Sequence, residues 1–217
     1  MRQNDGTGFK RLSELMPVAL DAPPPAQTWT DGSNSQPATK VRGIPVSRLS
    51  DTFENFDLAL NPGMREACNQ CQRLTTGDAW CALLAGEYGT GKSHLAIATI
   101  NAIGVNNGYF WKVPDFLEWL REKAYGDEKF PIDTLLRGYR GGQFLLVFDD
   151  YGTEKATDWA SEQLYRVLDS RYDLRLPTII TTNQPVNRID GRIISRFSEG
   201  LVVCRGKDIR RRPQVAR

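Results

Sequence analysis

The sequence predicts an α/β fold built on a parallel β-sheet. Short apolar runs typical of buried strands recur along residues 80–204, and stretches with helical spacing of apolar residues separate them. One strand-to-helix junction carries a glycine-rich loop, and two later strands end in acidic or amide side chains. In an open parallel sheet the strand ends lie along one edge, where ligands bind.

The glycine-rich loop covers residues 86–93 and matches the phosphate-binding pattern G-x-x-x-x-G-K-[ST] at every fixed position. The apolar residues 80–85 predict a strand before it, and residues 93–106 predict a helix after it. Backbone N–H groups of the loop and the helix start can therefore point at an anion. We expect Lys92 to reach the β- and γ-phosphates of ATP and the Ser93 hydroxyl to bind Mg²⁺. The predicted nucleotide-binding residues are Gly86, Glu87, Tyr88, Gly89, Thr90, Gly91, Lys92, Ser93 and His94.

Composition and charge leave the partner open. The chain has 217 residues and a formal net charge of +2, so any nucleic-acid surface would have to be local. No apolar run approaches the roughly 18 residues of a membrane span, and the polar N-terminus has no apolar signal region. We therefore expect a cytoplasmic protein without a membrane partner.

Four cysteines allow two interpretations. Cys68 and Cys71 form a C-x-x-C, which can bind zinc or carry redox chemistry. Cys81 and Cys204 fall in predicted strands without such a spacing, and His94 is the single histidine. Because a four-ligand zinc site is hard to assemble from these parts, we favour free thiols over a metal or redox role.

The chain divides at about residue 50. Residues 1–50 are rich in proline and polar residues and predict a disordered or extended arm, either a docking arm for a partner or a plain tail. Residues 51–217 predict one ATPase domain with a basic C-terminal tail. Phe53 and Phe56 at its start fit either a contact to a nucleotide base or a hydrophobic anchor.

The remaining elements alternate in type, as an α/β fold requires. Strands are predicted at 108–113, 144–150, 177–183 and 201–204, and helices at 61–74, 114–125, 157–172 and 191–197. The segment 114–140, with Lys112 before it, places basic residues beside aromatic ones. This pattern fits single-stranded DNA binding, and it equally fits an amphipathic helix with a solvated charged face.

Acidic and amide side chains end two of these strands. Asp149 and Asp150 follow the apolar run 144–148, which is a Walker B pattern. We expect Asp149 to hold Mg²⁺ through water and Asp150 to orient or deprotonate the attacking water. Asn183 is placed to hydrogen-bond that water or the γ-phosphate. The alternatives are an acidic strand boundary and a turn-forming asparagine before Gln184 and Pro185.

Together these segments resemble the AAA+ ATPases, and within them the DnaC/DnaI helicase loaders and the IstB-type transposition helpers. The resemblance implies a three-layer P-loop NTPase fold with a five-stranded parallel sheet of order 5-1-4-3-2. Here the chain departs from the family pattern, because little sequence follows Arg210, and we expect the lid to be reduced or absent. The matching strings are Phe53-Glu54-Asn55-Phe56, Gly89-Thr90-Gly91-Lys92-Ser93-His94-Leu95-Ala96, Asp149-Asp150-Tyr151-Gly152-Thr153-Glu154, Thr181-Thr182-Asn183, Ser195-Arg196-Phe197 and the spaced Gly206…Arg210.

The resemblance also implies roles and partners. Asn183 would be the sensor-1 residue, Arg196 an arginine finger acting on ATP in a neighbouring subunit, and Arg210 the sensor-2 arginine acting on its own ATP. Single-stranded DNA would be contacted from residues 114–140. The implied function is an ATP-hydrolysing replication protein that loads a replicative helicase. The alternatives are an IstB-like helper of a transposase and a switch module that binds ATP and DNA without hydrolysis.

Overall fold

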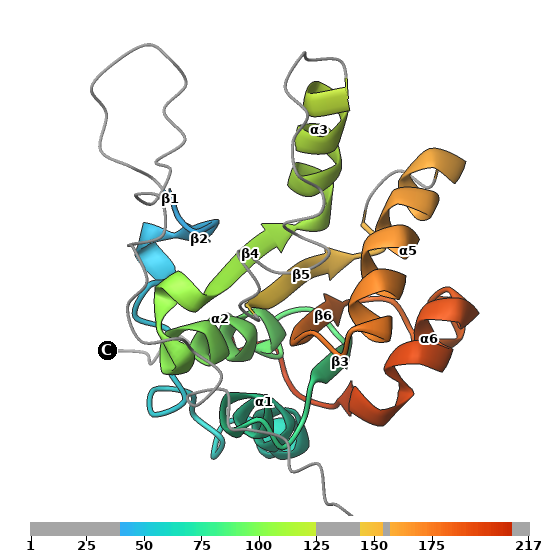
Figure 1. Cartoon of the computed structure of the whole chain (residues 1–217). Coiled ribbons are helices and arrows are strands. Elements are labelled where there is room, and N and C mark those ends of the chain that lie inside the picture. The colour runs from blue at the N-terminus through green and yellow to red at the C-terminus, as the bar shows by residue number, and fades with distance from the viewer. Residues whose placement is uncertain (1–39, 125–143, 154–156, 210–217) are drawn as a thin grey trace, which may run out of the picture.

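The structure is a computed structural model that describes residues 40–124, 144–153 and 157–209, and its centre is a five-stranded parallel sheet (Figure 1). The spatial order of the strands is β4-β5-β6-β3-β7. Numbered along the chain from β3, this is 5-1-4-3-2 read from the opposite edge, so the predicted fold is confirmed. The strands are β3 (Cys81–Gly86), β4 (Gly108–Lys112), β5 (Leu145–Tyr151), β6 (Thr178–Thr182) and β7 (Leu201–Cys204).

Helices cover both faces of the sheet (Figure 1). On one face, α1 (Arg65–Thr76) and α2 (Lys92–Ile103) pack on Ala82 and Leu84 of β3. On the other, α3 (Val113–Ala124), α5 (Asp158–Asp173) and α6 (Gly191–Phe197) pack on Leu83 and Ala85. Successive residues of β3 therefore enter two separate cores, which explains why this strand is apolar throughout.

The predicted elements that fall within the described residues are present, and their ends differ from the prediction by at most four residues. The largest difference is at α1, which was predicted to start at residue 61 and starts at Arg65. Helix α2 was predicted to reach residue 106 and ends at Ile103. Gly104 follows with φ +91°, and the next three residues form the 3₁₀ helix η3 (Val105–Asn107) before β4. Short 3₁₀ turns also precede α1 at η2 (Pro62–Met64), precede α6 at η5 (Val186–Arg188) and follow it at η6 (Ser198–Gly200).

Residues 40–50 correct the predicted domain boundary. They belong to the segment that the sequence assigned to a disordered arm, yet β1 (Lys40–Val41) and β2 (Ile44–Pro45) form an antiparallel hairpin, followed by η1 (Val46–Arg48). Ile44 is fully buried in the core beside α1 and α2. The sequence did not predict this hairpin, because a single buried isoleucine among polar residues produces no periodic pattern of apolar residues.

The aromatic residues of α3 belong to the core. Phe116 and Trp119 are buried and pack against Trp111, and Phe116 also contacts Phe148 of β5. Arg121 lies over the ring of Trp159 at 4.9 Å. These buried rings cannot stack on DNA bases, so within α3 the amphipathic-helix interpretation is the better one. Lys129, Arg137 and Arg140 of the same predicted surface lie outside the described residues.

Candidate nucleotide-binding site

The phosphate loop connects β3 to α2 through backbone that only glycine adopts readily. Gly89 and Gly91 have φ angles of +74° and +104°. A side chain on Gly89 would meet the Asp208 carboxylate, and one on Gly91 would meet the ring of Phe56. Phe56 is buried and its ring centroid lies 5.2 Å from that of His94, so it acts as the hydrophobic anchor of the two predicted alternatives.

Lys92 begins α2 and is folded over the loop. Its side chain is 5% exposed, and its ammonium donates to the carbonyl oxygens of Gly86 at 2.8 Å and Glu87 at 2.7 Å. These bonds hold the ammonium group over the loop. Lys92 therefore lies at the loop to which the sequence assigned it, and its contact with phosphates stays a prediction.

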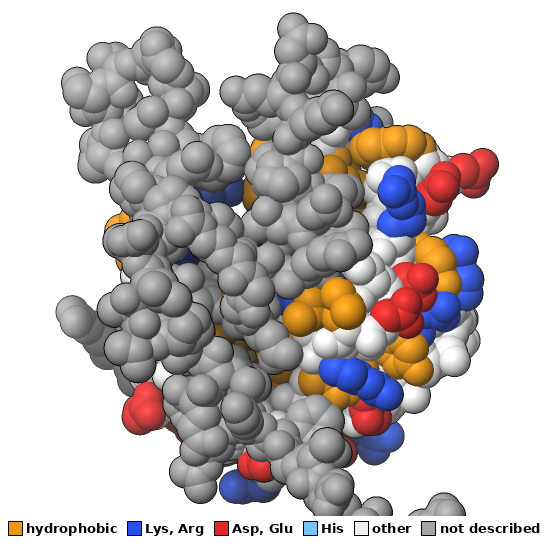
Figure 2. All heavy atoms as spheres, viewed as in Figure 1, with side chains coloured by type: hydrophobic (Ala, Val, Ile, Leu, Met, Phe, Trp, Pro, Cys, Tyr) orange, Lys and Arg blue, Asp and Glu red, His pale blue; other side chains and the backbone are white. Residues whose placement is uncertain are grey.

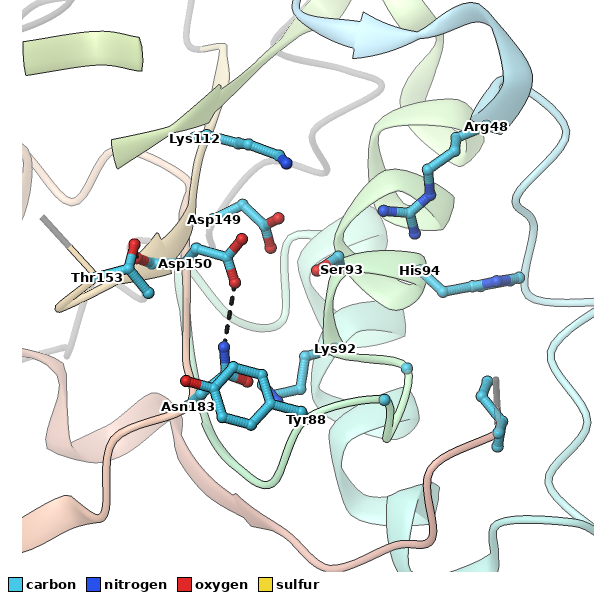
Figure 3. Close-up of a pocket in the computed structure, with 13 residues that line it drawn as sticks. Arg48, Tyr88, Lys92, Ser93, His94, Lys112, Asp149, Asp150, Thr153 and Asn183 are labelled. Atoms are coloured by element: carbon cyan, nitrogen blue, oxygen red, sulfur yellow. Dashed lines mark hydrogen bonds between the residues drawn. The ribbon is translucent and has the colours of Figure 1, made fainter. Parts of the chain in front are cut away.

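Thr181 of β6 organises the acidic side of the site. Its hydroxyl donates to Oδ1 of Asp149 at 2.6 Å and accepts from the backbone N–H of Asp150 at 3.1 Å. Asn183 donates from Nδ2 to Oδ1 of Asp150 at 3.1 Å (Figure 3). The sequence predicted Asp149, Asp150 and Asn183 but gave Thr181 no role of its own. Thr181 could have been identified from its position, because it lies two residues before Asn183 on the strand that pairs with the strand of Asp149.

A bulge at the end of β5 aims the second carboxylate. The pairing with β6 shifts register between Phe148 and Tyr151, and Asp150 has a φ of +60°. Bulges bend a strand and re-aim its side chains, and aspartate tolerates this left-handed conformation better than most residues. Asp149 stays pointed toward α2 while Asp150 turns toward Asn183, so the two adjacent acids face different neighbours.

Burial raises the pKa of the Asp149 carboxyl, which is 2% exposed. Hydrogen bonds from Thr181 and Ser93 and the positive charge of Arg48 act in the opposite direction, while the charge of Asp150 adds to the rise. The Ser93 hydroxyl and the Asp149 carboxylate therefore lie within hydrogen-bond reach of each other. Both are hard oxygen ligands of the kind that Mg²⁺ prefers, so these residues fit a magnesium ion.

These groups line a single pocket with a volume of about 510 Å³ (Figure 3). It brings together most of the predicted site, including Tyr88, Lys92, Ser93, His94, Asp149, Asp150 and Asn183. It also contains residues that the sequence did not predict for it. These are Arg48, Lys112, Thr153 and Ile209.

A buried asparagine joins the loop to the C-terminal segment. Asn61 donates from Nδ2 to the carbonyl oxygens of Thr90 at 2.9 Å and Lys207 at 3.2 Å, and its Oδ1 accepts from the Lys207 N–H at 3.0 Å. The Ile209 N–H donates to the carbonyl oxygen of Gly89 at 2.9 Å. The chain thus returns to the phosphate loop directly before Arg210, which itself lies outside the described residues.

Arg196 lies apart from this pocket. It sits on α6, where its Nε donates to Asp169 of α5 and its guanidinium lies 4.9 Å from the ring of Tyr165. It is not among the residues that line the pocket. A finger that serves a neighbouring subunit has to face outward, and the Arg196 side chain is 26% exposed.

The cysteines are free thiols, as the sequence favoured. Cys68, Cys71, Cys81 and Cys204 are all buried. Burial raises the pKa of Cys71, Cys81 and Cys204 to about 12, which keeps these thiols protonated and unreactive at neutral pH. Within the described ranges, no three His, Cys, Asp or Glu side chains cluster closely enough to hold a metal, and no helix is long and apolar enough to cross a bilayer.

Comparison with known protein families identifies the family of this chain. The profile of the IstB-like ATP-binding proteins matches residues 40–193, from the β1–β2 hairpin to α6. The chain belongs to this family. It is therefore an ATP-binding P-loop protein of the AAA+ class, and the matched region includes residues 86–93 and 149–150.

Individual relatives are distant. An insertion-sequence protein of Mycobacterium tuberculosis whose name assigns ATP binding is 26% identical over 140 residues, covering 63% of this chain and 54% of the relative. The chromosomal replication initiator DnaA of Bordetella pertussis is 28% identical over 200 residues, covering 86% of this chain and 39% of the relative. The chain therefore spans about half the length of the mycobacterial relative and less of the initiator.

Solved structures show the same fold. A DnaC helicase loader superposes with a TM-score of 0.61 at 24% identity, covering 74% of this chain and 99% of that one. A DnaA initiator bound to AMPPCP and single-stranded DNA superposes with a TM-score of 0.59 at 24% identity, covering 72% of this chain and 50% of the initiator. DnaI superposes with a TM-score of 0.59 at 20% identity, covering 76% of this chain and 93% of DnaI.

Proposed function

We propose that the protein is a Mg²⁺-dependent ATPase that works on single-stranded DNA as an oligomer and delivers a replicative helicase to it. The observation that supports hydrolysis most strongly is the network around Thr181. It holds Asp149, Asp150 and Asn183 opposite the phosphate loop in one pocket. A module that only binds nucleotide needs the loop but has no need of a second, separately aimed carboxylate.

Each residue of the pocket has a distinct task in this proposal. Lys92 exchanges the two loop carbonyls for phosphate oxygens, and the loop N–H groups bind the remaining phosphates. Ser93 and Asp149 would hold Mg²⁺, which supplies charge neutralisation at the phosphates when bound. Asp150, fixed by Asn183, accepts the proton of the attacking water or orients that water.

Arg196 completes the site from a neighbouring subunit in this proposal. Its position on α6 outside its own pocket supports action in trans, and Arg210 would act in cis beside Ile209. An arginine finger is worth about 10³ to 10⁵ in rate in the enzymes where it has been measured. Turnover should therefore rise steeply with protein concentration as oligomers form.

The partner is proposed from the relatives. Alignments to replication initiators cover most of this chain, which supports a role in replication. The shared fold with a DnaC helicase loader supports a helicase as the cargo. A transposase is the second candidate, because the family profile and the mycobacterial insertion-sequence relative support it. Co-purification of tagged protein with the helicase and the transposase of the same cell separates the two. Recovery of the transposase without the helicase would overturn the helicase-loader proposal.

Phosphate release tests the activity itself. We expect ATP hydrolysis that needs Mg²⁺, is stimulated by single-stranded DNA, and falls about 10²-fold or more in Lys92→Ala. Arg65→Ala, an exposed change on α1, serves as the matched control and should match wild type. Nucleotide binding without turnover, with or without DNA, would establish the non-hydrolysing switch module instead.

A further inference from the structure

Two cations that belong to neither nucleotide motif line the pocket. Arg48 comes from η1 and Lys112 from the end of β4, and both point into the cavity from the side opposite the phosphate loop (Figure 3). Lys92 approaches from the loop side. The pocket therefore has a second basic wall, and its charge faces Asp149 and Ser93.

The hairpin before η1 fixes the first cation. The Phe110 N–H of β4 donates to the Arg42 carbonyl oxygen at 3.0 Å, so the hairpin turn adds onto the open edge of the sheet. Asn101 of α2 donates to the carbonyl oxygens of Leu49 at 3.0 Å and Asp51 at 2.7 Å. Arg48 lies between these two attachments, on a segment that is anchored to both β4 and α2.

Arg48 has a partner that a phosphate could replace. Its Nη2 and Nε atoms lie 2.7 Å and 2.9 Å from Oδ2 of Asp51, and its side chain is 35% exposed. Its charge is close enough to Asp149 to lower the pKa of that carboxyl. A guanidinium that shares one carboxylate oxygen keeps other N–H groups for a second anion.

Lys112 is fixed by strand register. In the β4–β5 pairing it stands opposite Asp149, so its ammonium reaches the pocket beside the predicted magnesium ligand. Among residues 40–124, 144–153 and 157–209 it has no ion-pair partner within 4 Å. An unpaired ammonium directed into a cavity is a ready binding group for an anion.

We propose that Arg48 and Lys112 form a second phosphate clamp that acts in cis and binds the γ-phosphate of ATP. This rests on the proposed function, in which the loop holds the inner phosphates and the end of the pocket at Asp149, Asp150 and Asn183 receives the terminal one. The terminal phosphate adds negative charge beside two carboxylates, and the two cations on the side of the pocket away from the phosphate loop offset that repulsion. The clamp therefore favours ATP over ADP and ties the hairpin segment to the nucleotide state.

The test compares the affinities of a non-hydrolysable ATP analogue and of ADP, measured by calorimetry with Mg²⁺ at fixed salt. We expect Arg48→Ala and Lys112→Ala each to weaken the analogue about 10-fold and ADP less than about 2-fold, because one charged hydrogen bond to the terminal phosphate is lost. Arg48→Lys should retain part of the binding. Asp51→Asn should tighten the analogue, since it frees Arg48.

Controls separate this proposal from the proposed function. Arg65→Ala should change the affinity for neither nucleotide. Thermal unfolding identifies any variant that fails to fold. If Arg48→Ala fails to fold, Arg48→Lys and Arg48→Gln replace it in the test. Equal losses for the analogue and ADP, no loss at all, or loss of DNA stimulation alone would overturn the clamp. In each of these cases the proposed function would still hold if the wild type binds nucleotide and Lys92→Ala abolishes that binding. A wild type that binds neither nucleotide would overturn both.

Discussion

The nucleotide pocket and the outer face of α5 and α6 hold their charged side chains in different ways. In the pocket, Lys92 and Asp149 are nearly fully buried and are fixed by bonds to the loop and to Thr181. On the α5–α6 face, defined by Tyr165, Asp169, Tyr172, Arg192 and Arg196, the arginines lie over half-buried tyrosine rings and pair with acids. Basic, acidic and apolar side chains are mixed on this surface (Figure 2).

The difference separates a preorganised site from an adaptable one. Moving a buried charge costs desolvation and broken hydrogen bonds, whereas a partly exposed ion pair contributes only about 0 to 1 kcal/mol and can be exchanged. The pocket is therefore suited to hold one geometry. The α5–α6 face is suited to release Arg196 to another acceptor when a second subunit presents one.

The largest expected effect comes from Arg196. Arg196→Ala should lower the rate of ATP hydrolysis by about 10³-fold or more while ATP affinity changes less than twofold, because the residue lies outside its own pocket. Steady-state turnover and calorimetric binding check this. A parallel loss of affinity would mean that Arg196 serves its own site, and the contrast between the two regions would fail.

Thr181 tests the pocket side of the comparison. Thr181→Val removes the donor to Asp149 and the acceptor of the Asp150 N–H, and it should destabilise the fold by about 1 to 3 kcal/mol. We also expect turnover to fall by about 10-fold through misplacement of the carboxylates. Thr181→Ser keeps the hydroxyl and should restore both properties. Urea unfolding and phosphate release measure the two effects.

We expect the ionised Asp149 to lower the stability of the fold, although hydrolysis requires it. Burial raises its folded pKa above the unfolded value, so its ionisation disfavours the folded state as pH rises through that pKa. Asp149→Asn should therefore raise the unfolding temperature by about 2 to 4 °C at neutral pH, and the gain should shrink as the pH falls toward about 4. Mg²⁺-dependent hydrolysis should be lost. A lower melting temperature at pH 7 would show that the hydrogen bonds to Asp149 outweigh its desolvation.

The smallest expected effect is at Asp169. Asp169→Asn removes the counter-ion of Arg196 at a partly exposed site, so stability should change by less than about 1 kcal/mol. Turnover at limiting protein concentration should rise by a small factor, because Arg196 is released. Asp190→Asn, which affects the ion pair of the neighbouring Arg192, is the matched control and should leave turnover unchanged. A large loss of stability would mean that this ion pair is as rigidly held as the buried contacts of the pocket, which would contradict the comparison.

Sequence reasoning reached most of the fold because its strands are apolar on both faces and its helices are amphipathic. The β1–β2 hairpin escaped it, because Ile44 carries the burial alone and the contact of Arg42 with β4 is long-range. In the site, the motif residues were predictable, since each follows a strand end. Arg48 and Lys112 were not, because only the packed positions of η1 and β4 bring these ordinary surface-type residues to the pocket.

In the proposed mechanism one pocket requires residues from two chains, and a mixing experiment tests this requirement most directly. Lys92→Ala lacks a working loop but keeps Arg196, and Arg196→Ala has the converse defect. Each variant alone should be nearly inactive, whereas an equal mixture should regain about a quarter of wild-type turnover, because some sites then combine an intact loop with a neighbour's arginine. A mixture no more active than the sum of its separate components would contradict the claim.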